Sequence, residues 1–152
     1  MKSKTTLVVL VSSMIIFTLM LAIPNSVLAA TAKPLPPIKI GIVQSLSGMV
    51  SDYALEDLEG FRVKIAEVND KGGVKTKEGM RKIELLVRDD MLKPDVAVKN
   101  AKELILERKC DFLVGVISSG VLLAVSEWCK ENKVLLWGWD ARTHHATQAR
   151  GH

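Results

Sequence analysis

The segment Asp111–Val121, DFLVGVISSGV, decides the fold class of this chain. Its apolar run from Phe112 to Ile117 stops at two serines and a glycine, and a helix-like segment, Val121–Asn132, follows at once. An apolar run of this length, joined directly to a helix, is typical of a buried strand in a parallel sheet. The segment therefore predicts an α/β fold.

The serine turn in this segment is the first candidate site. Ser118, Ser119 and Gly120 would lie at the carboxyl end of the strand and at the N-terminus of the helix. Open α/β sheets bind ligands at this edge, and unpaired backbone N–H groups, the helix dipole and serine hydroxyls favour an anion there. The alternative is that the serines only cap the helix, which is the simpler interpretation of this turn taken alone.

The N-terminus is typical of a secretory signal peptide. Lys2 and Lys4 precede an uncharged stretch, Thr5–Thr31, with a long apolar centre. Pro24 then breaks the run, and small residues follow it, so we expect a signal peptide over residues 1–29 with cleavage after Ala29. An uncleaved membrane anchor is the alternative, because the apolar run approaches spanning length. Export would place the protein in the periplasm or another extracytoplasmic space.

Removing residues 1–29 leaves 123 residues, enough for one modest domain. The loss of two lysines lowers the net charge from +4 to +2, which is too small to indicate nucleic-acid binding. We expect a proline-rich lead-in over 30–37 and one domain over 38–152. Export would allow a disulfide between Cys110 and Cys129. One precedes a strand and the other lies inside a helix, so we expect two buried, unbridged thiols and no metal site.

Four strands and three helices alternate along the domain. The expected helices carry apolar residues at helical spacing, such as Leu58, Phe61, Ile65 and Val68 in the first. This alternation predicts parallel strands joined by right-handed crossovers, with helices on both faces of the sheet. We expect strands over 38–43, 82–88, 112–117 and 134–139, and helices over 55–69, 94–108 and 121–132.

In such a fold, every segment that leaves a strand starts from the same edge of the sheet. The pair Asp89 and Asp90 suggests a metal or phosphoryl site, but no third carboxylate or lysine accompanies it, and a solvated turn is the expected role. The polar or aromatic residues that this edge gathers are Ser45, Ser47, Tyr53, Asp89, Asp90, Ser118, Ser119, Asp140 and Thr143.

These junctions resemble a known family, the type I periplasmic binding proteins. Residues 38–47 (IKIGIVQSLS), followed by Gly48 and Tyr53, are similar to the opening of that family, and most similar to its branched-chain amino-acid (Leu/Ile/Val) branch. The runs 88–90, 115–119 and 140–143 continue the match in order. The resemblance implies a Rossmann-like lobe, incomplete here because the chain would stop within the first lobe, as a partial N-terminal ligand-binding lobe.

The resemblance also implies a function and a site. The function is an extracytoplasmic solute-binding component of an ABC importer for branched-chain or related amino acids, with an ABC permease in the membrane as partner and no cofactor. Family members hold the carboxylate of the ligand at the turns after the third and fourth strands, and place an aromatic residue beside it. Carried over by position, the ligand-binding residues are Tyr53, Ser118, Ser119, Ala141 and Thr143.

The sequence departs from the family beside the second of these turns. Trp137 and Trp139 are bulkier than the residues expected there. Either Trp139 reshapes the pocket, or both tryptophans simply pack against the sheet.

Other kinds of chemistry find little support. Gly41 and Gly48 stand too far apart for a phosphate-binding or dinucleotide loop. His144 and His145 are adjacent, so on a helix they point about 100° apart, which suits no shared metal. No pairing of a nucleophile with a base is visible, so we expect no enzyme. Two alternatives stay open: the ligand-binding ectodomain of a signalling receptor with the same fold, and a non-functional gene fragment.

Overall fold

The computed structural model describes residues 34–139 and 141–143. The expected signal peptide, the start of the expected lead-in, Asp140 and the histidine pair therefore lie outside the described residues. Of the helices in the described ranges, none combines the length and the apolar character needed to cross a membrane.

Four parallel strands form the main sheet, in the spatial order β4-β1-β5-β6. The chain goes from β1 to β4 on one side and then returns to β5 on the other, so the strand order reverses between β1 and β5. Such a reversal is the topological switch point of an open α/β sheet. The strands are β1 Ile38–Gln44, β4 Ile83–Asp89, β5 Phe112–Gly115 and β6 Leu136–Gly138.

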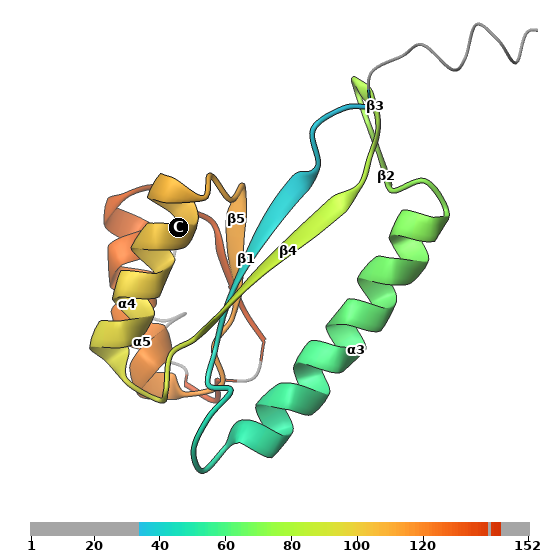
Figure 1. Cartoon of the computed structure of the whole chain (residues 1–152). Helices are drawn as coiled ribbons and strands as arrows, with labels where there is room; N and C mark the ends of the chain where they lie inside the picture. Colours follow the sequence, from blue (N-terminus) through green and yellow to red (C-terminus); the bar gives the residue numbers. More distant parts are fainter. Residues whose placement is uncertain (1–33, 140, 144–152) are drawn as a thin grey trace, which may run out of the picture. The chain divides into compact units, whose positions relative to one another are not determined.

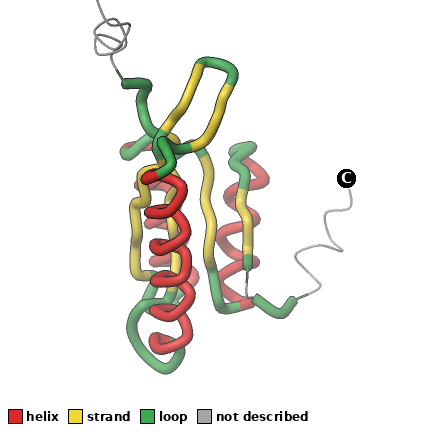
Figure 2. Tube along the Cα trace, turned by 90° about the vertical axis from the view of Figure 1, so that its right-hand side faces the viewer, coloured by secondary structure: helices red, strands yellow, loops and turns green. Residues whose placement is uncertain are grey.

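Helices cover both faces of this sheet, as the alternation of elements predicted. One long helix, α3, runs along one face, while α4 and α5 lie side by side on the other (Figure 1, Figure 2). A short π-helical segment, η1, continues α4 and completes the second expected helix. The bounds are α3 Ser51–Asp70, α4 Pro94–Lys102, η1 Glu103–Glu107 and α5 Ser119–Glu131.

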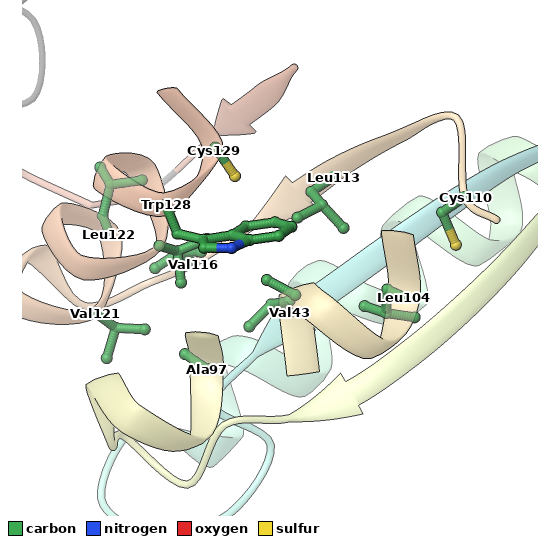
Figure 3. Packing of buried hydrophobic residues seen from close by; sticks show 12 residues of the cluster. Val43, Ala97, Leu104, Cys110, Leu113, Val116, Val121, Leu122, Trp128 and Cys129 are labelled. Atoms are coloured by element: carbon green, nitrogen blue, oxygen red, sulfur yellow. The ribbon is translucent and has the colours of Figure 1, made fainter. Parts of the chain in front are cut away.

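The larger part of the hydrophobic core lies between the sheet and the pair α4 and α5 (Figure 3). Val43 of β1 and Leu113 of β5 are fully buried there, in one cluster with Ala97 and Ala101 of α4 and Leu104 of η1. Burial of the larger of these side chains, valine and leucine, stabilises the fold by about 1.5–3 kcal/mol each. This face therefore holds the sheet in place.

The face under α3 is covered less completely. Leu58 is buried, but Phe61, Ile65 and Val68 of the predicted stripe are only half-buried. The reason is that α3 is the one helix on this face in the described part of the chain. The Trp137 side chain of β6 is accordingly 63% exposed.

The predicted start of the first helix, at residue 55, was wrong. The helix begins at Ser51, because a turn at Gly48 (φ +87°) precedes it and the Gly48 carbonyl accepts hydrogen bonds from both the backbone N–H and the hydroxyl of Ser51. Tyr53 therefore lies in the first turn of α3 and not in a loop.

The segment between α3 and β4, for which the sequence predicted neither a helix nor a strand, contains regular structure. It forms an antiparallel hairpin of two short strands, β2 (Val74–Thr76) and β3 (Gly79–Arg81). The Thr76 hydroxyl donates to the Gly79 carbonyl at 2.9 Å across the two-residue loop. Strands of three residues carry too little periodic pattern to be recognised. The hairpin lies at the amino end of the main sheet, away from the candidate site.

The two cysteines form no disulfide and are both buried, as predicted. Cys110 and Cys129 belong to the same hydrophobic cluster but come from different elements (Figure 3). Burial raises the pKa of the Cys110 thiol above its ordinary value. Both side chains therefore act as small apolar core residues.

Candidate functional site

Two aspartates at the carboxyl end of β4 accept hydrogen bonds from the neighbouring loops at the carboxyl edge of the sheet. Asp89 Oδ1 accepts hydrogen bonds from the backbone N–H groups of Leu46 and Met91, both at 2.9 Å. Asp90 Oδ1 accepts from the Ser45 hydroxyl at 2.5 Å and from the Leu92 N–H at 2.8 Å. The loop after β1 is thereby tied to the loop after β4.

The expectation of a solvated turn at these aspartates was wrong. Asp90 is fully buried, and Asp89 is half-buried. Burial raises the pKa of Asp90, against the hydrogen bonds from Ser45 and Leu92 that lower it. Met91 and Leu92 adopt left-handed backbone with φ of +53° and +59°, a strained conformation for such residues that the aspartate hydrogen bonds support. The pair organises the edge of the sheet.

The serine turn follows a strand that is shorter than predicted. β5 ends at Gly115 and not at Ile117, because Gly115 and Val116 have φ of +113° and +69° and turn the chain out of the strand. A Cβ on Gly115 would lie 2.5 Å from the Val43 carbonyl oxygen, so only glycine fits. Val116 is fully buried, which holds this bend against the core.

Ser118 occupies the N-cap position of α5 but makes no side-chain capping hydrogen bond. Simple capping by Ser118, the alternative weighed from the sequence, is therefore wrong. The first turn of α5 also lacks an acidic residue, whereas α3 and α4 carry Asp52 and Asp95 there. The positive end of the α5 dipole is thus left without a compensating carboxylate from its own first turn.

An open hollow of about 300 Å³ lies beside this turn, lined by Tyr53, Ile117, Ser119 and Arg142. It brings together two of the predicted site residues, Tyr53 from α3 and Ser119 from α5. The Tyr53 side chain is 68% exposed.

The other predicted residues are not among those that line the hollow. Ser118 precedes Ser119 at the helix start. Ala141 packs against the larger hydrophobic cluster, and the Thr143 N–H donates to the Ala141 carbonyl at 3.1 Å, which closes a tight turn.

Sequence reasoning missed Arg142 as a site residue. It is exposed and lines the hollow together with Ser119. A signal was present, because Arg142 lies between Ala141 and Thr143, which were both predicted as site residues. A guanidinium group beside a helix N-terminus adds positive charge where an anion is already favoured.

The two tryptophans behave differently from each other. Trp139 is half-buried and its ring lies 5.2 Å from that of Phe61 on α3, centroid to centroid, whereas Trp137 is largely exposed. The interpretation that both pack against the sheet is therefore wrong for Trp137. Among the described residues, no group of three His, Cys, Asp or Glu side chains is placed to hold a metal ion.

The sheet order, the helices on both faces and the switch point define an α/β lobe of the kind found in solute-binding proteins. The family described as Periplasmic binding protein matches residues 37–151. The chain belongs to that family.

Individual relatives agree with this assignment. The Leu/Ile/Val-binding protein BraC3 of Rhizobium johnstonii is 32% identical over 99 residues, which cover 65% of this chain and 26% of the relative. The Leu/Ile/Val-binding protein of Escherichia coli K12 is 25% identical over the same share of both chains. The chain thus spans about a quarter of the length of the curated relatives it matches.

Solved structures show the same fold. The branched-chain amino acid substrate-binding protein LivJ from Streptococcus pneumoniae, in complex with isoleucine, aligns with a TM-score of 0.67 and 25% identity, over 74% of this chain and 31% of that one. A branched-chain amino acid transporter protein from Rhodopseudomonas palustris aligns with a TM-score of 0.63 and 29% identity, over 72% and 29%. A solute-binding protein of R. palustris, in complex with 4-hydroxybenzoate, shares the fold at a TM-score of 0.62 and 24% identity, over 74% and 29%.

Proposed function

We propose that this chain is part of an extracytoplasmic solute-binding component of an ABC importer and captures a branched-chain or related amino acid. The observation that carries the proposal is the serine turn at the switch point of a periplasmic binding protein lobe, where Ser118 makes no capping bond. An ABC permease in the membrane is the partner that the family implies. The relatives named for Leu, Ile and Val binding support the choice of ligand.

In this proposal the carboxylate of the ligand binds at the N-terminus of α5. Backbone N–H groups there have no intrahelical acceptor, and the helix dipole favours negative charge. Ser118 and Ser119 add hydroxyl donors, and Arg142 supplies a positive charge at the same hollow. Ala141 and Thr143, in the turn after β6, contribute through their backbone or hydroxyl groups, since the Ala141 side chain packs in the core. The Tyr53 ring lies against the side chain of the ligand.

The charge arrangement favours a carboxylate over a cationic or neutral solute. The first turn of α5 carries no acidic side chain, and Arg142 lines the hollow beside it. A cation would be repelled by the positive end of the α5 dipole and by the Arg142 guanidinium group. A neutral solute would gain neither the dipole interaction nor the charge-assisted hydrogen bonds, which are about twice as strong as neutral ones.

Isothermal titration calorimetry of the chain with isoleucine, leucine, valine and 4-hydroxybenzoate tests the proposal. We expect the three amino acids to bind and Ser119→Ala to weaken their binding by about 1–3 kcal/mol, since one hydrogen-bond donor to an anion is lost. Thr76→Ala is the matched control, because it removes a hydroxyl from the hairpin at the opposite end of the sheet. Equal affinity of Ser119→Ala and the parent chain would overturn the site assignment.

A further inference from the structure

Gln44 is a fully buried amide whose side chain has no protein partner. It is the last residue of β1 and has 0% exposure, and within the described part of the chain neither its Nε2 nor its Oε1 has a hydrogen-bond partner. Its backbone carbonyl, in contrast, accepts from the N–H groups of Leu46 and Asp90. A buried amide without partners is destabilising. A polar residue here is therefore better suited to a group that arrives from outside the chain than to packing.

Gln44 lies at the end of β1, beside the switch point of the sheet. Ile40 and Ile42 of β1 belong to the cluster on the α3 side of the sheet, and Gln44 follows them in the two-residue alternation of a strand. Its Oε1 lies 3.5 Å from where a Cβ on Gly115 would be, so the amide reaches over the end of β5. β1 and β5 are the strands between which the sheet order reverses, and open α/β sheets bind ligands at that point.

A second buried donor without a described partner belongs to Trp139, the residue after β6. The indole Nε1 of Trp139 is buried, and no partner for it exists among the described residues. The Trp139 backbone N–H donates to the Gly115 carbonyl at 3.4 Å, and its ring makes a tilted contact with the Phe61 ring, with 5.2 Å between the centroids. Gln44, at the end of β1, and Trp139, after β6, thus come from the two strands that flank β5, and together they carry two buried donor groups and one buried acceptor without a described partner.

We propose that Gln44 is a specificity-determining residue of this site, and that it selects the zwitterionic head group of an α-amino acid together with Trp139. Gln44 Oε1 accepts a hydrogen bond from the ligand's ammonium group. Gln44 Nε2 and Trp139 Nε1 donate to the carboxylate, which has acceptor sites left after the serine turn. A simple carboxylic acid has no adjacent donor and leaves Gln44 Oε1 unpaired. This inference rests on the proposed function.

The test compares two ligands and two amide-removing variants of the full chain. The ligands are isoleucine and the carboxylic acid with the same carbon skeleton but no amino group. The variants are Gln44→Leu and Asn69→Leu. Asn69 is the matched control because its amide is fully used at the opposite end of β4, where it donates to the Ile83 carbonyl at 2.8 Å and accepts from the Ile83 N–H at 2.7 Å.

The expected results separate recognition from stability. Gln44→Leu weakens binding of both ligands, because both lose the bond from Nε2, but it weakens isoleucine binding about tenfold more, because only isoleucine also loses the bond from its ammonium group to Oε1. The variant does not lower the thermal midpoint. Asn69→Leu lowers the thermal midpoint and keeps the preference of the folded protein for isoleucine. The inference is overturned if Gln44→Leu binds both ligands as the parent does, or weakens both equally.

Amide NMR spectra of the parent chain distinguish the two possible failures. We expect the Ser119 backbone amide and the Gln44 side-chain amide, assigned through Gln44→Leu, to shift together as isoleucine is added. If the Ser119 signal shifts and the Gln44 side-chain signal does not, the inference fails and the proposed function stands. If neither moves at millimolar isoleucine, the proposed function fails and the inference falls with it.

Discussion

The Ser45 hydroxyl donates to Asp90 Oδ1 at 2.5 Å, and both residues are fully buried at the carboxyl edge of the sheet. This bond joins the ends of β1 and β4, the two strands with the most extensive pairing. Because hydrogen bonds to carboxylates are short and strong in a buried setting, the contact fixes the loop that leads into α3. Tyr53, in the first turn of α3, is positioned through that loop.

Ser45→Ala should destabilise the fold by about 1–3 kcal/mol, since it leaves the buried Asp90 carboxylate with one donor fewer. The midpoint and slope of urea unfolding measure the change. Ser126→Ala is the matched control, because the Ser126 hydroxyl is also buried but donates only to the Leu123 carbonyl of its own helix, at 3.0 Å. Equal losses in the two variants would contradict a special role for the Ser45–Asp90 bond.

Stability should depend on pH through Glu103. Hydrogen bonds from Arg88, at 2.6 and 3.2 Å, and from Arg108 lower the pKa of Glu103 from 4.5 to about 2. As the pH falls, Glu103 takes up a proton in the unfolded chain before it does so in the folded protein. The stabilisation of the fold by ionised Glu103 is therefore complete above pH 4.5 and is lost as the pH falls through about 2.

The measurement is urea unfolding at a series of pH values between these limits. Glu103→Gln should show a shallower loss of stability than the parent over this window. Glu107→Gln changes the net charge equally and carries no ion pair among the described contacts, so it should follow the parent. A parent-like slope in Glu103→Gln is the result that counts against the prediction.

Gly115→Ala should destabilise the protein by more than about 2 kcal/mol, because the new methyl group meets the Val43 carbonyl at 2.5 Å in a left-handed conformation. Gly60→Ala is the control. Gly60 lies inside α3 with open space around its Cβ position, so alanine should stabilise the fold by about 0.5–1 kcal/mol. Thermal unfolding followed by circular dichroism distinguishes the opposite signs.

The thiols of Cys110 and Cys129 should react slowly with a thiol reagent in the native protein and quickly in urea, because both are buried. Burial also raises the pKa of Cys110, which lowers the fraction of reactive thiolate. Two equivalents of reagent should be consumed once the chain unfolds. No reaction even in urea would indicate a disulfide.

Much of the fold follows from local pattern. The apolar run before Ser118 and the helical spacing in residues 94–108 marked a buried strand and a core helix, and both are present. These assignments succeed because burial of one face leaves a periodic trace in the sequence. The hairpin over residues 74–81 left no such trace, since its strands have three residues each and only partial burial.

The sequence by itself determined the α/β class, the family resemblance, the two buried thiols and the edge at which to look for a ligand. Only the tertiary structure decided what the polar residues at that edge do. Asp90 and Gln44 are polar residues, and polar residues usually lie at the surface, so the sequence alone would not predict their burial. Both are buried because β1, β4 and β5 end side by side, a relationship between residues up to 71 positions apart, from Gln44 to Gly115, that no local pattern encodes.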